Sequence, residues 1–201
     1  VHGGDGARLA QMLGIATEDV LDLSASLNPC APDVGSVVVR HLGDLRRYPD
    51  VSDATRDLAE AMGVDPGRML LCNGGAEAIA LVASIMRVGS VTDPEFSLYR
   101  RHLREVRPDG PSWRSDPHNP TGALAPPDQF DAVRDEAFYP LTTGQWTRGD
   151  ERAVVVGSLT KLWACPGLRL GYVLAPVDSD GFVDELTRRQ PAWSVSGLAS
   201  G

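Results

Sequence analysis

The segment from Ala153 to Tyr172 constrains the fold most, because it places two apolar runs on either side of a single lysine. The first run covers Ala153 to Gly157, and the second covers Leu168 to Leu174. Short runs rich in valine and leucine, bounded by glycine, are typical of buried β-strands. Lys161 stands between the runs and is the only lysine of the chain, because the other eighteen of its 19 basic residues are arginine.

A single lysine in an arginine-rich chain indicates a position that arginine cannot fill. Arginine can replace lysine as a surface charge, but its guanidinium stays protonated and forms no imine. The alternative is an ordinary surface lysine whose stem lies on apolar neighbours. The neighbours of Lys161 favour chemistry, since Ser158 and Thr160 precede it and Arg169 follows it. Two hydroxyls and a guanidinium can hold a phosphate dianion beside a reactive amine.

Strand-like and helix-like stretches alternate along the chain, which indicates an α/β fold with a mainly parallel sheet. Residues 69–72 predict a buried strand, and an Asn-Gly-Gly turn then opens a helix from Ala76 to about Arg87. The N-terminus of a helix after such a turn can bind phosphate, although many glycine turns only connect a strand to a helix. The pattern also predicts helices over 53–62, 97–106, 127–133 and 180–189, and an irregular segment over 108–120.

Composition excludes several classes of protein. A net charge of −8 and a pI near 4.9 argue against a nucleic-acid-binding protein. The 3 cysteines are widely spaced and form no CxxC pair, so neither a disulfide framework nor a metal site is indicated. The most apolar run, 69–86, contains Asn73 and Glu77 and is not expected to cross a membrane. The N-terminus lacks the apolar core of a signal peptide, and a cytoplasmic protein is expected.

The motifs around the lysine resemble those of a known family. Ser-Leu-Thr-Lys followed by Pro-Gly-Leu-Arg-Leu-Gly-Tyr is similar to the cofactor-lysine segment of fold-type I pyridoxal-phosphate enzymes, in the class I and II aminotransferase family. The glycine turn, Pro-Glu-Phe-Ser-Leu-Tyr, Asn-Pro-Thr-Gly and Asp-Glu-Ala-Phe precede it in the order that this fold requires. Within the family, the chain most resembles the branch of threonine-phosphate decarboxylase and histidinol-phosphate aminotransferase.

The resemblance implies the cofactor pyridoxal 5'-phosphate and two catalytic residues. Lys161 would hold the cofactor covalently, and Asp135 would pair with the pyridine nitrogen and keep it protonated, so that the ring accepts electrons. Asn119 would donate to the phenolic oxygen and Phe96 would stack on the ring. The remaining cofactor contacts implied are Gly75, Ala76, Phe138, Ser158, Thr160, Arg169 and Tyr48. Judged alone, Asp135 is an ordinary loop carboxylate and Asn-Pro-Thr-Gly an ordinary turn.

Further motifs favour one member of this branch. His-Gly-Gly, Ser-Ala-Ser-Leu-Asn-Pro, Arg-Tyr-Pro-Asp and Gln-Pro-Ala-Trp-Ser-Val resemble the threonine-phosphate decarboxylases of cobalamin biosynthesis. Phe138 agrees, since histidinol-phosphate aminotransferases usually carry tyrosine there. By this resemblance His2 and Asn28 would face a phosphorylated amino-acid substrate. Tyr48 would reach the cofactor phosphate of a neighbouring subunit, which implies a homodimer.

The resemblance leaves three functions open. The first is decarboxylation of O-phosphothreonine, and the second is transamination, for example of histidinol phosphate. The third is a catalytically incomplete protein that only binds the cofactor. This alternative arises because the family continues into a smaller C-terminal domain whose arginines hold the substrate, and that domain is missing here. The spacings from Phe96 to Asn119 and from Asn119 to Asp135 are also shorter than in the family.

These motifs divide the chain into two parts. Residues 1–50 are expected to form an N-terminal segment, and residues 51–201 a shortened pyridoxal-phosphate-binding large domain that is truncated at its C-terminal end. The expected architecture is the three-layer α/β large domain with a mainly parallel sheet.

Overall fold

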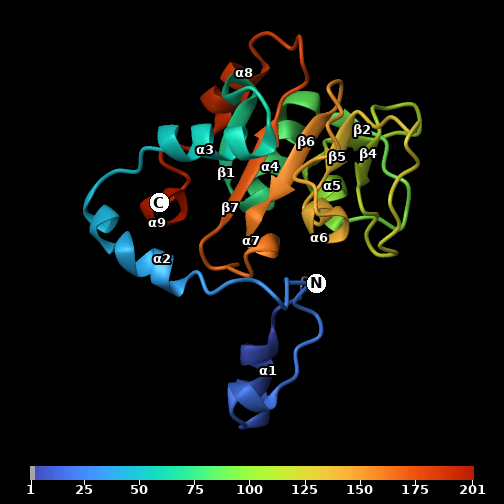
Figure 1. Ribbon diagram of the computed structural model, residues 1–201. Helices are drawn as coiled ribbons and strands as arrows, with labels where there is room; N and C mark the ends of the chain where they lie inside the picture. The colour runs from blue at the N-terminus through green and yellow to red at the C-terminus, as the bar shows by residue number, and fades with distance from the viewer. Residues whose placement is uncertain (1–2) are drawn as a thin grey trace.

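The computed structural model describes residues 3–201 and is built around a sheet of five strands in the order β1-β7-β6-β5-β4 (Figure 1). These strands are β1 (Met69–Asn73), β4 (Trp113–Ser115), β5 (Val133–Asp135), β6 (Val154–Ser158) and β7 (Leu170–Leu174). Strand β7 is antiparallel to both neighbours, whereas β6, β5 and β4 pair in parallel. Because β1 also opposes β7, four of the five strands point the same way, which confirms the mainly parallel sheet.

Two very short strands extend this sheet beyond β4. Strand β2 (Val88–Gly89) pairs in parallel with β3 (Glu105–Val106). A single parallel bridge between Ser90 and Ser112 links this pair to the segment that leads into β4. Few backbone hydrogen bonds therefore hold this edge of the protein together.

Short helices connect and cover the strands. They are α1 (Gly6–Leu13), α2 (Gly35–Arg40), α3 (Ser52–Met62), α4 (Gly74–Met86), α5 (Ser97–His102), α6 (Tyr139–Thr143), α7 (Leu159–Leu162), α8 (Phe182–Arg189) and α9 (Gly197–Ser200). Single 3₁₀ turns lie at η1 (Thr17–Asp19), η2 (Leu42–Arg46) and η3 (Pro66–Arg68). In the described part of the chain, no helix is long and apolar enough to cross a membrane.

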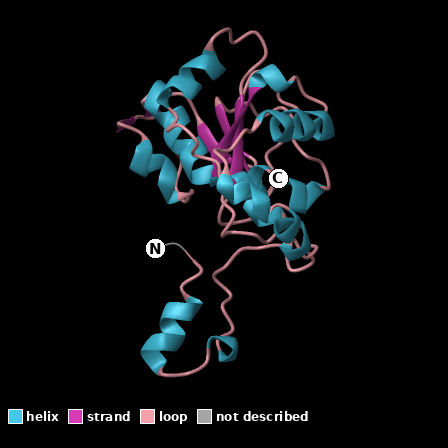
Figure 2. Ribbon diagram, turned by 90° about the vertical axis from the view of Figure 1, so that its left-hand side faces the viewer, coloured by secondary structure: helices cyan, strands magenta, loops and turns pink. Residues whose placement is uncertain are grey.

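The two faces of the sheet are covered by different helices, which gives three layers (Figure 2). Side chains alternate between faces along each strand. Val154 and Val156 of β6 pack into a core with α4, α5 and α8. Val155, which lies between them, packs into a second core with α3 and with Val195 near the C-terminus. The expected three-layer large domain is thereby confirmed.

The second face is covered unevenly. Helix α3 lies over β1 and β7, whereas no helix of the described chain connects β4 to β5. The connection is a long loop, residues 116–132, and the residue of β5 that points to this face is Arg134 rather than an apolar residue. A polar network, described below, fills the place between this loop and the sheet.

Three of the local predictions are wrong in this same region. Residues 127–133 form no helix, because they belong to the loop and enter β5. The helix expected over 97–106 ends at His102, after which the chain turns into β3. The segment 108–120, expected to be irregular, contributes β4. The last two errors share one cause: strands of two or three residues, such as β3 and β4, are too short to show a hydrophobic period.

The N-terminal helix stands apart from the sheet. Helix α1 extends away from the three-layer body, and the following chain returns beside it (Figures 1 and 2). The apolar side chains of Met12, Leu21 and Leu23 are more than 70% exposed, although residues of this type are usually covered. The N-terminal segment thus presents an apolar surface that this chain does not cover.

Candidate active site

The parallel strands bring the predicted site residues to one edge of the sheet. Strands β1, β4, β5 and β6 all end at this edge, where Asn73, Ser115, Asp135 and Ser158 are their last residues. In α/β proteins, ligands bind in the crevice outside the carboxyl ends of the strands. Residues distant in the sequence are adjacent here for this reason.

Lys161 lies on α7, directly after β6, and its side chain is half-buried. Burial lowers the pKa of its amine, and the nearby positive charge of Arg169 lowers it further. The amine lies 5.8 Å from the centre of the Phe138 ring, which is also within reach of a cation–π contact. A lowered pKa makes the neutral, nucleophilic form of the amine more accessible near neutral pH.

Asp135 is the last residue of β5 and lies at the same edge of the sheet as Lys161. Its Oδ2 accepts a 2.8 Å hydrogen bond from the Tyr99 hydroxyl, and its Oδ1 accepts a 3.0 Å hydrogen bond from the Ala137 amide. Burial raises the pKa of Asp135 to about 6, although these two hydrogen bonds and the charge of Lys161 oppose the rise. The carboxylate is therefore ionised at neutral pH, and a cationic partner would stabilise its buried negative charge.

A candidate phosphate cradle lies where α4 begins. Helix α4 is 13 residues long, and its first turn contains Gly74, Gly75 and Ala76, whose N–H groups precede the helical hydrogen-bond ladder. Gly74 has a φ of +73°, and a Cβ built there would lie 2.3 Å from the Arg169 guanidinium. Only glycine therefore allows this close approach of Arg169 to the helix terminus.

Hydroxyl groups complete the cradle from β6. The Cβ of Ser158 lies 3.4 Å from where a Cβ of Gly75 would be. The Ser158 and Thr160 hydroxyls contact each other at 2.8 Å, and both residues are buried. Arg169 itself adopts a φ of +57°, which is uncommon outside glycine and found often at functional sites. Among the described residues no carboxylate forms a salt bridge with Arg169, so its charge is available to an anion.

Phe96 and Asn119 lie on loops at the neighbouring strand ends. Phe96 immediately precedes α5 and its ring meets that of Tyr99 edge-on, with centroids 5.7 Å apart. Asn119 is half-buried in the loop after β4, and its backbone N–H donates to Ser115 Oγ at 2.7 Å. The structure thus brings both residues to the edge that carries Asp135.

The remaining predicted residues differ in position. Asn28 joins the site region, because its amide donates to the Lys161 carbonyl at 3.1 Å and its side chain donates to the Leu162 carbonyl at 2.9 Å. Tyr48 is 77% exposed and stacks on Trp193, with ring centroids 4.4 Å apart. His2 lies outside the described residues.

Sequence reasoning missed three residues that support the site. Tyr99 binds Asp135, and Ser115 and Glu95 bind the loops that carry Asn119 and Phe96. Tyr99 lies in the first turn of α5, three residues after Phe96, which precedes the helix. This spacing places both side chains near one face of the helix. That spacing is the signal that could have identified Tyr99.

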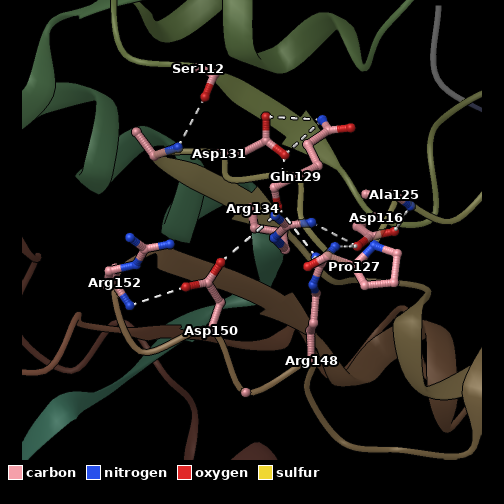
Figure 3. A network of polar contacts seen from close by, with 12 residues as sticks. Ser112, Asp116, Ala125, Pro127, Gln129, Asp131, Arg134, Arg148, Asp150 and Arg152 are labelled. Atoms are coloured by element: carbon pink, nitrogen blue, oxygen red, sulfur yellow. Dashed lines mark hydrogen bonds and ion pairs between the residues drawn. The ribbon is translucent and has the colours of Figure 1, made fainter.

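A buried charge network supports β5 from the opposite face (Figure 3). Arg134 is fully buried, donates to Asp116 at 2.8 Å and lies 3.3 Å from Asp131. Arg148 reaches the same Asp116 oxygen at 3.2 Å and donates to the carbonyls of Pro126 and Pro127. The network ties the loop between β4 and β5 to the strand that carries Asp135.

The fold and these motifs agree with those of known proteins that are similar to this chain. Residues 115–200 match the family model described as aminotransferase class I and II. Threonine-phosphate decarboxylase from Salmonella typhimurium is 29% identical, over 99% of this chain and 68% of that protein. Histidinol-phosphate aminotransferase 1 from Dechloromonas aromatica is 25% identical, over 95% of this chain and 65% of that protein.

Solved structures share the fold. L-threonine-O-3-phosphate decarboxylase from Porphyromonas gingivalis has a TM-score of 0.72 at 23% identity, covering 88% of this chain and 65% of that one. Histidinol-phosphate aminotransferase from Clostridium acetobutylicum has a TM-score of 0.79 at 20% identity, covering 90% and 67%. Histidinol-phosphate aminotransferase from Sinorhizobium meliloti, solved in complex with pyridoxal-5'-phosphate, has a TM-score of 0.70 at 18% identity, covering 88% and 61%.

Together these findings agree with the predicted class: residues 115–200 are similar to class I and II aminotransferases, and the chain shares its fold with an aminotransferase solved in complex with pyridoxal-5'-phosphate. Within that class its relatives include both threonine-phosphate decarboxylases and histidinol-phosphate aminotransferases. The chain spans about two thirds of the length of these relatives. The match to the Salmonella protein extends over 248 residues, more than the 201 residues of this chain, so that protein has internal segments absent here.

Proposed function

We propose that this chain forms the cofactor-binding large domain of a pyridoxal-phosphate-dependent decarboxylase that acts on a phosphorylated amino acid such as O-phosphothreonine. The observation that carries the proposal is the convergence of Lys161, Asp135 and the cradle formed by α4, Ser158, Thr160 and Arg169 at one sheet edge. An amine, a carboxylate and an anion cradle are the three groups that a phosphorylated pyridine aldehyde requires.

The residues present fit this cofactor at both ends. The absent Cβ of Gly74 lets the Arg169 guanidinium lie against the start of α4, where its unpaired charge favours a phosphate dianion. At the other end Asp135 is ionised at neutral pH and buried, which suits a protonated pyridine nitrogen. When bound, pyridoxal phosphate supplies an electron-accepting ring that stabilises negative charge on the substrate α-carbon.

The chain's own residues then have separable tasks. Lys161 would hold the cofactor through its amine, and its free amine would move a proton to or from the substrate carbon. Its lowered pKa supports both tasks, because a neutral amine is a nucleophile and a base. Asp135 holds the ring nitrogen, Asn119 the ring oxygen, and Phe96 and Phe138 border the ring.

Asn28 and His2 are the residues proposed to contact the substrate. Asn28 is held against the backbone of Lys161 and Leu162, which supports a role beside the reacting amine. His2 is proposed as a second substrate contact. The decarboxylase is preferred because a threonine-phosphate decarboxylase is 29% identical over nearly the whole chain, and because Phe138 agrees with that branch.

We further propose a homodimer in which Tyr48 contacts the cofactor phosphate of the partner. The exposure of Tyr48 and the uncovered apolar side chains of residues 9–23 support this arrangement. In this proposal residues 1–50 are a separate N-terminal segment, and residues 51–201 are the cofactor-binding domain. Sedimentation at several protein concentrations tests the dimer directly.

The second candidate reaction is transamination, which the structural likeness to histidinol-phosphate aminotransferases supports. The two reactions differ in which bond of the substrate α-carbon is held perpendicular to the ring. Release of carbon dioxide from phosphothreonine supports the decarboxylase, whereas consumption of an amino donor only with a keto acid supports the aminotransferase. A protein that binds the cofactor and performs neither reaction corresponds to the third possibility, an incomplete enzyme.

The test of cofactor binding comes first. Purified protein is incubated with pyridoxal phosphate, reduced with borohydride, and digested for peptide mass spectrometry. We expect one adduct, on Lys161, and none in Lys161→Ala. Absence of an adduct in the wild-type chain contradicts the proposed function.

A further inference from the structure

Glu95 is a buried carboxylate in a site that otherwise attracts anions. Its side chain is only 3% exposed, and it lies in the loop between β2 and α5, directly before Phe96. Burying a carboxylate is costly unless hydrogen bonds satisfy its oxygens. The partners of Glu95 therefore indicate why the residue is present.

Both oxygens of Glu95 accept hydrogen bonds, one from its own loop and two from Ser115, the last residue of β4. Oε1 accepts a 3.0 Å hydrogen bond from the Phe96 amide and a short hydrogen bond from the Ser115 hydroxyl. Oε2 accepts a 3.1 Å hydrogen bond from the Ser115 amide. The Ser115 hydroxyl in turn accepts the 2.7 Å hydrogen bond from the backbone N–H of Asn119. A continuous path of hydrogen bonds thus runs from Phe96 through Glu95 and Ser115 to Asn119.

The sheet gives these loops little other support. Strand β2 has only two residues and β4 only three. A single β-bridge, between Ser90 and Ser112, joins the segment after β2 to the segment before β4. His118 adds two further contacts, because its Nε2 donates to the Pro94 carbonyl at 2.8 Å and lies 3.9 Å from Oε2 of Glu95. The bonds of Glu95 are therefore a large share of the polar contacts between the two loops.

We propose that Glu95 is a positioning residue that fixes the Phe96 loop against the Asn119 loop and so sets the separation of the two groups that hold the cofactor ring. The identity of that ring rests on the proposed function, whereas the tie between the loops does not. The negative charge of Glu95 also contributes, after burial, to raising the pKa of Asp135. Glu95 touches no reacting atom in this proposal and acts through Phe96 and Asn119.

Hydrogen exchange of the protein without cofactor tests the tie itself. In Glu95→Ala we expect the amides of Phe96, Ser115 and Asn119 to exchange at least about tenfold faster, because each loses a direct or second-step bond. Glu95→Gln keeps one acceptor oxygen and is expected to lie between the wild type and the alanine variant. Unchanged exchange at these amides in a folded Glu95→Ala protein overturns the proposal.

A second variant decides the matter if Glu95→Ala unfolds, which accelerated exchange throughout β6 would reveal. Ser115→Ala keeps the carboxylate but removes the hydroxyl between Glu95 and Asn119. Faster exchange at Asn119 in that variant, with β6 protected, supports the proposal, and unchanged exchange there overturns it. Asp93→Asn is the matched control, because Asp93 lies on the same loop but is exposed and pairs with Arg100.

Cofactor affinity provides the functional readout. Titration with pyridoxal phosphate, followed by its visible absorbance, is expected to give about tenfold weaker binding for Glu95→Ala and an unchanged value for Asp93→Asn. Equal affinities for wild type and Glu95→Ala overturn the positioning role. If the wild type binds no pyridoxal phosphate, the proposed function fails, while the exchange result still decides whether Glu95 ties the two loops.

Discussion

The Tyr99 hydroxyl donates a 2.8 Å hydrogen bond to Asp135, which joins the helix after the Phe96 loop to the carboxylate at the end of β5. Tyr99 is itself buried against Trp113, with ring centroids 5.8 Å apart, so its hydroxyl has little freedom to move. The bond lowers the pKa of Asp135 against the rise that burial causes. Tyr99 therefore keeps Asp135 ionised at a pH where burial alone would favour the neutral acid.

Removing that hydroxyl is expected to shift the pH dependence of cofactor binding. In Tyr99→Phe, the pKa of Asp135 rises above about 6, by about one pH unit if the lost bond has the strength usual for a charged acceptor. Titrations with pyridoxal phosphate between pH 5 and 9 should show the acidic loss of affinity moving to higher pH. Tyr139→Phe, on the neighbouring helix α6, serves as the control. Identical pH profiles for Tyr99→Phe and wild type would contradict this role.

The Arg134 network is expected to stabilise the fold strongly. Arg134→Met leaves the buried Asp116 and Asp131 without their main partner, and breaking a buried ion pair in this way costs about 3–5 kcal/mol. Arg56→Met is the matched control, since Arg56 pairs at 2.7 Å with Asp53 on the exposed surface of α3, where pairs contribute about 0–1 kcal/mol. Urea unfolding measures both changes. A loss for Arg134→Met no larger than for Arg56→Met would show that the network is not needed for stability.

Glu136 is expected to make stability fall as the pH rises. Burial raises its pKa to about 7 from an ordinary value of 4.5, so the folded protein retains a proton that the unfolded chain releases within this window. The free energy of unfolding should therefore decrease between about pH 4.5 and 7, by roughly 3 kcal/mol in total at about 1.4 kcal/mol per pH unit.

Glu136→Gln tests this linkage because glutamine does not titrate. Relative to wild type, the variant should gain stability progressively from pH 5 to pH 8, as urea unfolding at each pH would reveal. The raised pKa of Asp135 contributes equally to both proteins and cancels in the difference. Glu60→Gln on exposed α3 should leave the pH dependence unchanged. A constant difference between wild type and Glu136→Gln across this range would rule the linkage out.

Alanine variants of two glycines can separate the effect of backbone strain from an effect on anion binding. Gly74 and Gly63 both have positive φ, +73° and +68°, but a Cβ would meet Arg169 only at Gly74 and nothing within 4 Å at Gly63. Each glycine-to-alanine change should cost about 1 kcal/mol of stability through strain. Only Gly74→Ala should also weaken binding of inorganic phosphate or pyridoxal phosphate, by about tenfold, because it displaces the Arg169 guanidinium. Equal affinities in the two variants would argue against the cradle.

Much of the site was predictable because its motifs are local. The glycine turn, Asn-Pro-Thr-Gly, Asp-Glu-Ala-Phe and Ser-Leu-Thr-Lys each follow or end a strand, and parallel strands place their carboxyl ends together. In the structure Lys161 and Asp135 accordingly lie at one edge of the sheet, after the adjacent parallel strands β6 and β5. The roles assigned to the individual site residues stay predictions until the variants are measured.

Only the tertiary structure decided the parts that depend on contacts between distant segments. A strand as short as β4 carries no detectable period, so the sequence did not reveal it, and residues 127–133 were wrongly expected to be helical. The partners of Arg134 and Glu95 lie on loops up to 20 residues away, and loop paths depend on packing rather than on local preference. The amino-acid sequence was sufficient to predict the α/β class and to identify the motifs at the strand ends, because both follow from short local patterns. The charge network and the tie between the Phe96 and Asn119 loops arise only once the folded sheet brings those loops together.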